Sequence, residues 1–214
     1  MNIENNILRH YLKNVYFISG NACGGKTTMS RLLAQKHGLL LYDMDAVYDS
    51  HRAIADPLHQ PETCYHMRDH HEQWTRPVEE QARWTLASIR EQTEMVLLDL
   101  IRLSADRPVV ADVLFSPHYT REIIADDHII FLTVDKSFIR KNYFDRLEKR
   151  DFYQFVKAQP LAALYFENIF QSLELVNDLE QQAMRQTGFR MLERTVQSTA
   201  ESALRQIEEH FGLN

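Results

Sequence analysis

Residues 15–27 read Val15-Tyr16-Phe17-Ile18-Ser19-Gly20-Asn21-Ala22-Cys23-Gly24-Gly25-Lys26-Thr27, and this stretch decides the fold. It opens with an apolar run rich in strand-forming residues. Residues 20–27 then match the spacing G-x-x-x-x-G-K-[ST], the phosphate-binding P-loop motif. The residues after the motif read as a helix that ends at Gly38. Strand, glycine loop and helix in this order are the context that the motif requires.

The chemistry of the motif follows from its residue types. Its glycines let the backbone curve until successive N–H groups point at one anion, and the next helix adds its positive N-terminal end. Lys26 is placed to reach the β- and γ-phosphates of ATP, and the Thr27 hydroxyl is placed to bind Mg²⁺. A glycine-rich turn beside a surface lysine is the alternative. The residues that we expect to hold ATP are Gly20, Asn21, Ala22, Cys23, Gly24, Gly25, Lys26, Thr27 and Thr28.

Length and composition narrow the class of protein. The chain has 214 residues, which is enough for one α/β domain with a full core. Its net charge is −6, which argues against a nucleic-acid partner, because such proteins usually carry a basic surface. No apolar run is long enough for a membrane span, and no signal peptide is visible. Cys23 and Cys64 do not suggest a disulfide framework, so we expect a cytoplasmic protein.

Four more strand-like segments follow the first. They lie at residues 39–42, 109–113, 128–134 and 189–192. Helices are predicted by apolar periodicity and capping signals before the first strand, over residues 77–104 and 161–186, and after the capping pattern at residues 198–201. Continuous apolar strands separated by helices predict a buried parallel sheet in a three-layer α/β sandwich.

A second group of polar residues, Asp43-Met44-Asp45, follows the second predicted strand. The carboxyl ends of strands in an open α/β sheet are where ligands bind. An extended D-x-D segment would place both carboxylates on one face, beside the P-loop. One carboxylate could hold Mg²⁺, and the other could orient an acceptor hydroxyl or accept its proton. The alternative is that an Asp caps a helix over residues 46–52.

The two motifs, at residues 20–27 and 41–45, together resemble the small P-loop kinases, the group of shikimate kinase, gluconate kinase and adenylate-kinase-like enzymes. The resemblance implies a five-stranded parallel sheet with strand order 2-3-1-4-5 and one kinase domain over residues 1–214. It also implies that Asp45 orients the acceptor as a base and that Asp43 supports the metal. The resemblance does not extend to residues 46–107, which we expect to form a helical insertion that binds the acceptor.

A third carboxylate, Asp112, ends the third predicted strand. In many P-loop kinases this position faces the phosphates or the acceptor, so Asp112 is a candidate Mg²⁺ ligand or substrate contact. Val113 follows it, so the paired acidic residues of hydrolytic ATPases are missing, and no N-K-x-D sequence for reading guanine occurs. Both features favour a kinase, and they favour ATP over GTP as the donor.

Arg146 and Arg150 are four residues apart, so a helix would present them together. They resemble the arginines of the lid in adenylate-kinase-like enzymes, and we expect such a lid over about residues 140–156. Positive charge there would neutralise the phosphoryl oxygens, and closure would exclude water. The alternative is a solvated helix of mixed charge.

The insertion combines arginines with aromatic residues. They are Tyr48, Arg52, Tyr65, Arg68, Trp74, Arg76, Arg83 and Trp84. This composition suits an anionic small-molecule acceptor with a ring portion, although packed tryptophans and surface arginines are the alternative. Cys64, His66, His70 and His71 are residue types that bind zinc, but their spacing matches no familiar zinc finger, so a metal there stays open.

The sequence therefore predicts an enzyme that transfers the γ-phosphoryl group of ATP to a hydroxyl of a small molecule, with Mg²⁺. The expected catalytic residues are Lys26, Asp45, Arg146 and Arg150, and the expected metal-binding residues are Thr27, Asp43 and Asp112. One alternative is a nucleoside or nucleoside-monophosphate kinase. Another is a regulatory P-loop protein that binds nucleotide without phosphotransfer. The acceptor and the oligomeric state are not determined by the sequence.

Overall fold

Five strands form one parallel sheet in the order β2-β3-β1-β4-β5, in a computed structural model that describes residues 3–65, 70–115 and 117–213. The strands are β1 (Val15–Gly20), β2 (Leu40–Asp43), β3 (Val109–Asp112), β4 (Ile129–Val134) and β5 (Met191–Arg194). Every neighbouring pair is parallel. The predicted parallel sheet and its strand order are confirmed.

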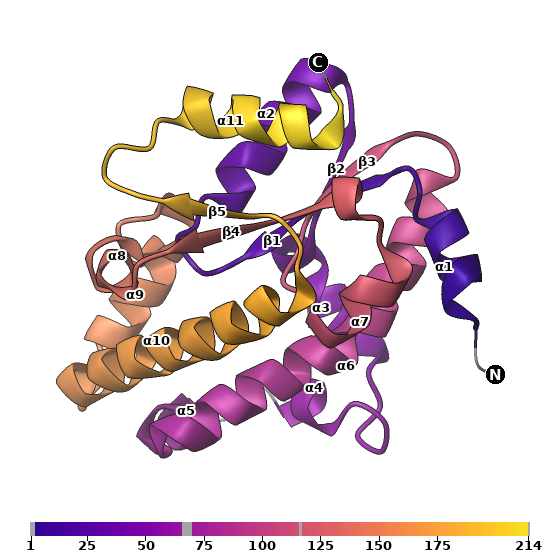
Figure 1. Ribbon diagram of the computed structural model, residues 1–214. Coiled ribbons are helices and arrows are strands. Elements are labelled where there is room, and N and C mark those ends of the chain that lie inside the picture. The colour runs from indigo at the N-terminus through magenta and orange to yellow at the C-terminus, as the bar shows by residue number, and fades with distance from the viewer. Residues whose placement is uncertain (1–2, 66–69, 116, 214) are drawn as a thin grey trace.

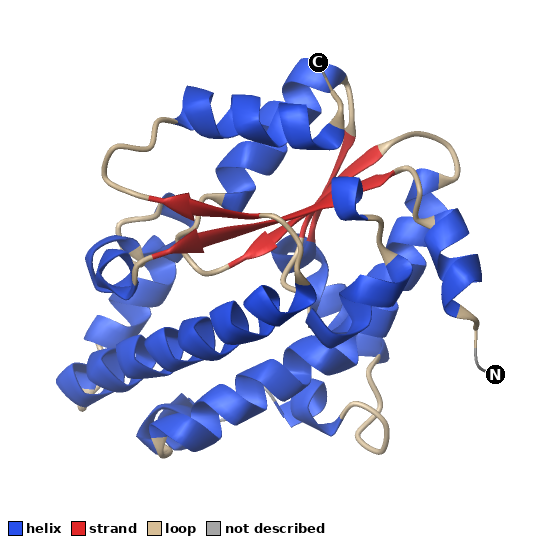
Figure 2. Cartoon of the chain, viewed as in Figure 1, coloured by secondary structure: helices blue, strands red, loops and turns tan. Residues whose placement is uncertain are grey.

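Helices cover both faces of the sheet (Figures 1 and 2). One face is covered by α2 (Lys26–His37) and α11 (Ala200–Phe211), and the other by α1 (Asn5–Tyr11), α6 (Val78–Ser104), α7 (Pro117–Ile123) and α10 (Ala162–Thr187). The remaining helices are α3 (Met44–Ile54), α4 (Pro61–Tyr65), α5 (His70–Thr75), α8 (Lys136–Asn142) and α9 (Arg150–Lys157), with short 3₁₀ turns η1 (Asp126–His128) and η2 (Leu147–Lys149). The predicted three-layer sandwich is therefore confirmed.

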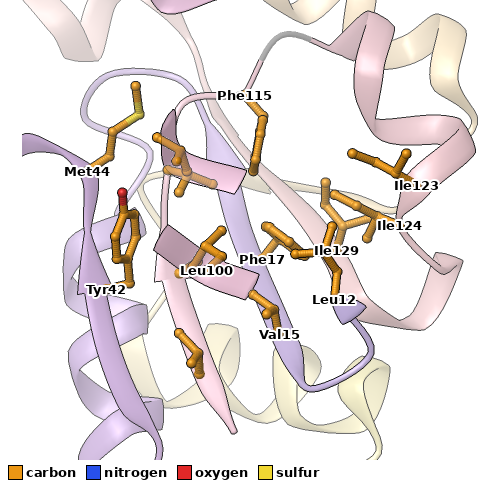
Figure 3. Packing of buried hydrophobic residues seen from close by; sticks show 14 of the residues in the cluster. Leu12, Val15, Phe17, Tyr42, Met44, Leu100, Phe115, Ile123, Ile124 and Ile129 are labelled. Carbon is orange, nitrogen blue, oxygen red and sulfur yellow. The ribbon is translucent and has the colours of Figure 1, made fainter. Parts of the chain in front are cut away.

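The core follows from the alternation of side chains along each buried strand. In β1, Val15 and Phe17 face the layer of α6, α7 and α10, whereas Ile18 faces α2 and α11. Figure 3 shows Val15 and Phe17 packed beside Ile129 of β4 and Leu100 of α6. Because both faces are covered, the strands are apolar along their whole length, and this is why they could be recognised in the sequence.

Two predicted boundaries at the end of the chain differ from the structure. The last strand begins at Met191 rather than at Phe189, because α10 ends at Gly188 in a left-handed conformation with φ 73° and the chain must turn before it can pair. Phe189 is buried in the core instead of pairing. The last helix is capped by Thr199 rather than Ser198, since the Thr199 hydroxyl accepts from Ser202 N at 3.1 Å.

A separate cluster of aromatic and aliphatic side chains lies away from the sheet, and we call it the outer cluster. It joins α5, the turn after α8, α9 and α10. Its members are Trp74, Tyr143, Phe144, Phe152, Val156, Tyr165, Phe166, Ile169 and Leu173. The outer cluster therefore connects part of the insertion to the segment that follows β4.

Within residues 3–65, 70–115 and 117–213, no helix combines the length and the apolar character needed to cross a bilayer.

Candidate active site

The P-loop lies tightly against the end of β4, and its glycines are required there. Gly20 has φ +125°, and a Cβ built on it would lie 2.0 Å from the carbonyl oxygen of Leu132. A Cβ on Gly24 would lie 2.6 Å from the same oxygen. The backbone N–H of Asn21 donates to that oxygen at 2.9 Å. Only residues without a side chain fit at both positions, so the loop keeps its open, concave backbone.

Side chains of α10 and β5 also form hydrogen bonds with the P-loop. Asn177 Oδ1 accepts from the backbone N–H of Ala22 at 3.3 Å, and Gln181 Nε2 donates to Asn21 Oδ1 at 2.8 Å. Arg194 donates to the carbonyl oxygen of Cys23 at 3.0 Å. The sequence analysis did not predict a role for Asn177, Gln181 or Arg194. Asn177 and Gln181 are polar residues in a long predicted helix, but nothing in the sequence linked that helix to the loop.

Lys26 and Thr27 begin α2 and point into the site beside Asp112. In this state Lys26 Nζ donates to the carbonyl oxygen of Asn21 at 3.1 Å. Burial raises the pKa of Asp112, while the charge of Lys26 and a hydrogen bond from Thr27 act in the opposite direction. The parallel register places Asp43 of β2 directly beside Asp112 of β3. Thr27, Asp43 and Asp112 are thus brought to one corner of the sheet.

The oxygen donors at this corner fit Mg²⁺, which prefers carboxylate, hydroxyl, phosphate and water oxygens. In the part of the chain that the structure describes, no three His, Cys, Asp or Glu side chains gather closely enough to hold a metal ion by themselves. A Mg²⁺ here would therefore take most of its ligands from phosphate oxygens and water, as is usual for this ion at nucleotide sites.

The Asp43-Met44-Asp45 segment differs from the predicted extended conformation. Asp43 ends β2 and is the N-cap of α3, and its side chain accepts from Asp45 N at 3.0 Å. Asp45 therefore lies in the first helical turn rather than on a strand, because the cap favours a helix that starts at once. The capping alternative was right for Asp43, and both carboxylates nevertheless border the same cavity.

A side-chain contact joins α3 to α6 one to two turns after Asp45. His51 Nε2 lies 2.8 Å from Asp99 Oδ2 of α6, and the Tyr42 hydroxyl donates to the same oxygen at 3.2 Å. His51 is 4% exposed, so the contact is buried. It fixes the direction of α3 and therefore the position of Asp45 at the start of that helix.

One cavity of about 840 Å³ joins the P-loop to the helical insertion. Its phosphate end is bordered by residues 21–23 and 25–28 with Asp43, Asp45 and Asp112, and its far end by side chains of α5, α6 and α10. A smaller cavity of about 140 Å³ lies on the other side of the loop. Its walls include Thr28, Arg194, Ser198 and Ala203. The two ends of the larger cavity present different chemical groups, so the cavity could bind two ligands side by side.

The two predicted lid arginines do not lie on one helix. Arg146 is extended, with φ −72° and ψ 136°, and precedes η2, whereas Arg150 begins α9. Residues 143–145 form a turn between α8 and η2, and Tyr143 and Phe144 of this turn pack into the outer cluster. Arg146 borders the large cavity and pairs with Glu148 at 2.9 Å. Arg150 is exposed and is not among the described residues that border the cavity.

The arginines of the insertion are also separated. Arg76 borders the cavity, where it pairs with Glu72 at 2.8 Å and lies over the ring of Trp84 at 4.6 Å. Arg52 and Arg83 are not among the described residues that border it. Arg68 and His66 lie outside the described residues. His71 contacts the hydroxyl of Tyr165.

The comparisons with known proteins concern the fold. Neither a protein-family model nor a curated protein matches the sequence. Among solved structures, a shikimate kinase from Acinetobacter baumannii, in complex with shikimate, matches with a TM-score of 0.51 and 16% sequence identity. The match covers 91% of this chain and 90% of that chain. At this identity the likeness concerns the fold, and the protein therefore shares the P-loop kinase fold of shikimate kinase.

Proposed function

We propose that this protein is a kinase that transfers the γ-phosphoryl group of ATP to a hydroxyl of a small molecule. The observation that carries the proposal is the single cavity that runs from Lys26 and Thr27, past Asp45, into the insertion. A protein that only binds nucleotide needs the phosphate end alone. The second end, with a carboxylate at the junction, is what an acceptor requires.

The phosphate end would hold ATP through residues 20–28. Backbone N–H groups of the loop and the N-terminus of α2 would bind the phosphates, and Lys26 would move from the Asn21 carbonyl to the β- and γ-phosphates. The smaller cavity beside Thr28 and Ser198 would take the adenine. Thr27, Asp43 and Asp112 would hold Mg²⁺, directly or through water. When bound, Mg²⁺ would neutralise charge on the phosphate oxygens.

The junction of the two ends would carry the chemistry. The acceptor oxygen forms a bond to the γ-phosphorus, and the bond from that phosphorus to the bridging oxygen breaks with its electron pair remaining on ADP. The hydroxyl proton passes to the Asp45 carboxylate. Arg146 would neutralise the phosphoryl oxygens, and Arg150 would join it as residues 140–156 close. Residues 46–107 would bind the acceptor within the same kinase domain. The similar structure is a shikimate kinase in complex with shikimate, which supports a small acceptor.

The test is the variant Asp45→Asn, which keeps the size of the side chain and removes the base. We expect ATP binding to be retained and the transfer rate to fall by about 10²–10⁴-fold, because Asn cannot accept the proton. The matched control is Asp49→Asn, on an exposed position one turn further along α3 that is not among the described residues that border the cavity.

Activity is measured as ADP formed from ATP and Mg²⁺ in the presence of a small-molecule extract of the cells that express the protein. Full transfer by the Asp45→Asn variant would remove Asp45 from the mechanism. Tight ATP binding without any stimulation of ADP formation by the extract would contradict the kinase and favour a nucleotide-regulated protein.

A further inference from the structure

The far end of the large cavity is lined by uncharged polar side chains on facing helices. On α6 these recur every three or four residues, so they occupy one face of the helix. The full set is Gln73 of α5, Gln81, Thr85, Ser88 and Gln92 of α6, and Asn168 and Ser172 of α10. Carboxamides and hydroxyls in this number form a wall that binds by hydrogen bonds rather than by charge.

Two of these carboxamides are buried and have an unused acceptor. Gln73 is 7% exposed and Gln92 is 3% exposed, and both border the cavity. Among the described residues, their Oε1 atoms have no hydrogen-bond partner, although Gln92 Nε2 donates to Ser88 Oγ at 3.2 Å. A buried carbonyl oxygen without a partner lowers stability, so native proteins keep few of them. At the wall of a ligand cavity, the partner that such oxygens lack is an O–H or N–H of the ligand.

The positive charge that α5, α6 and the turn between them place at this end is already paired. Among the described residues of α5, α6 and the turn between them, Arg76 is the one cation that borders the cavity. Its guanidinium pairs with Glu72 at 2.8 Å. The carboxylate of Asp45 borders the same cavity. Arg146 and Lys149 also border it, and the proposed function assigns their segment to the phosphoryl group. An acceptor with its own carboxylate would face Asp45 and find Arg76 engaged, so the site favours an uncharged molecule.

The remaining surface is apolar and aromatic. Trp74 and Phe152, whose ring centroids are 5.6 Å apart, border the cavity together with Ile89. Flat apolar surface beside a hydrogen-bonding wall suits a ring that has C–H faces and hydroxyl edges. A long flexible chain would gain less from it, since its ordering costs more entropy.

We infer that the acceptor is an uncharged ring compound with several hydroxyl groups, a neutral sugar or cyclitol, whose hydroxyls donate to Gln73 and Gln92. This inference rests on the proposed kinase function and departs from the anionic acceptor that the arginine content of the sequence favoured. The product would be a phosphate monoester, whose negative charge comes from the phosphoryl group alone. Gln73 and Gln92 would then determine specificity.

The first test identifies the charge of the acceptor. The protein is incubated with Mg²⁺, ATP that carries ¹⁸O in its γ-phosphoryl group, and the small-molecule extract described above. Products that contain the heavy phosphoryl group are found by mass spectrometry, treated with phosphatase, and passed over an anion exchanger at neutral pH. We expect the dephosphorylated acceptor to pass through unretained and without the ultraviolet absorption of a nucleobase.

An acceptor that is retained on the exchanger, or one that contains a nucleobase, would overturn the inference and leave the kinase proposal standing. The absence of any heavy product, with ATP bound, would overturn the kinase proposal itself, and the inference with it. The two failures are therefore distinguishable.

The second test uses Gln73→Met and Gln92→Met, which keep the length of the side chain. If the carboxamides bind the acceptor, each variant lowers the rate with dilute extract by about 5–15-fold, the loss of one hydrogen bond, while the rate at saturating extract changes little. The melting temperature of Gln73→Met stays equal or rises, because a buried unpaired oxygen is removed, and that of Gln92→Met changes little, because the bond from its Nε2 to Ser88 Oγ is lost as well.

The matched control is Gln186→Met, at an exposed position of α10 away from the cavity, which should change neither quantity. Unchanged rates with dilute extract for both cavity variants, when both are folded, would show that the carboxamides do not contact the acceptor and would overturn the inference. A lower melting temperature together with an equal fall of both rates would mark a structural role and would also overturn it.

Discussion

Gly20 and Gly24 place the backbone of the P-loop against Leu132 with no space for a side chain. We predict that Gly20→Ala lowers stability by about 3 kcal/mol or more, because it combines a backbone clash with a positive φ. The melting temperature should fall by about 6 °C or more, and the Kd for ATP should rise at least about tenfold. Thermal unfolding and equilibrium titration with Mg²⁺ and ATP measure both effects.

The control for this prediction is Gly38→Ala. Gly38 also has a positive φ, +66°, but nothing lies within 4 Å of a Cβ built on it. Its substitution should cost only the strain of the conformation, about 1–2 kcal/mol, and should leave ATP affinity unchanged. Equal loss of stability in both variants would show that the P-loop can relax away from β4, contrary to the geometry.

Glu180 is a buried carboxyl group in the helix that supports the P-loop. It is 3% exposed on α10, one turn after Asn177, and burial raises its pKa to about 8 although the charge of Lys26 acts in the opposite direction. Between pH 4.5 and 8 the folded protein keeps this proton while the unfolded chain releases it, so the contribution of Glu180 to stability falls as pH rises through that window.

We predict that Glu180→Gln matches the wild type in melting temperature at pH 5 and exceeds it by about 4–8 °C at pH 8, for a gain of about 2 kcal/mol. The exposed Asp178→Asn on the same helix should show no such pH dependence. Melting curves of the three proteins across pH give the comparison. A Glu180→Gln variant that is less stable than the wild type at pH 8 would mean that the ionised carboxylate pairs with Lys26.

At the scale of elements, the segment from α8 to α9 separates two arginines that the sequence grouped together. Arg146 borders the cavity with its side chain 28% exposed, whereas Arg150 is exposed at the start of α9. We predict that Arg146→Ala lowers kcat by about 10²-fold, the typical loss of one charge-stabilising group, and that Arg150→Ala lowers it by less than about tenfold. Steady-state rates with saturating ATP and extract measure this.

Arg140→Ala supplies the control on the same segment. Arg140 pairs with Glu167 and Glu174 on the surface, away from the residues described as bordering the cavity, so its loss should leave kcat unchanged. A larger loss of kcat in Arg150→Ala than in Arg146→Ala would indicate that closure rearranges this segment more than the present geometry implies.

The elements show what local sequence can and cannot predict. The strands were predictable because covered parallel strands are apolar throughout, as in Ile129–Val134, and the P-loop because its spacing is fixed by the backbone. The sequence predicted that Asp45 lies beside the P-loop, but it did not predict the helical position of Asp45, since the choice between strand and helix at Asp43 depends on one capping bond.

Other site residues could not be predicted from local sequence. Asn177 and Gln181 support residues about 155–160 positions earlier in the chain, and such contacts exist only once the sheet has formed. Gln73 and Gln92 belong to no sequence motif. Whether a glutamine can bind a ligand depends on whether its carboxamide already has a hydrogen-bond partner, and only the fold shows this.

On the scale of the whole molecule, the buried side chains form two regions, the core on the two faces of the sheet and the outer cluster. The clusters on the two faces of the sheet contain strand residues that are fully buried, such as Phe17, Ile18 and Ile130. The outer cluster contains no strand residue among its described members and joins three helices and the turn after α8. We expect the outer cluster to open independently of the sheet, because it shares few contacts with it.

Trp74 is the side chain that tests this independence. It is 4% exposed, packs against Tyr165 and Phe152, and its carbonyl oxygen accepts from Asn168 Nδ2 at 2.7 Å. Removing the ring leaves a cavity that costs about 3–5 kcal/mol locally. We predict that Trp74→Ala accelerates amide hydrogen exchange in α5 and α9 by about 10²-fold or more, whereas exchange in β1 and β4 changes by less than about threefold. Equal acceleration in all four elements would show that the molecule unfolds as one unit, and acceptor binding would then have to stabilise the sheet as much as the far end of the cavity.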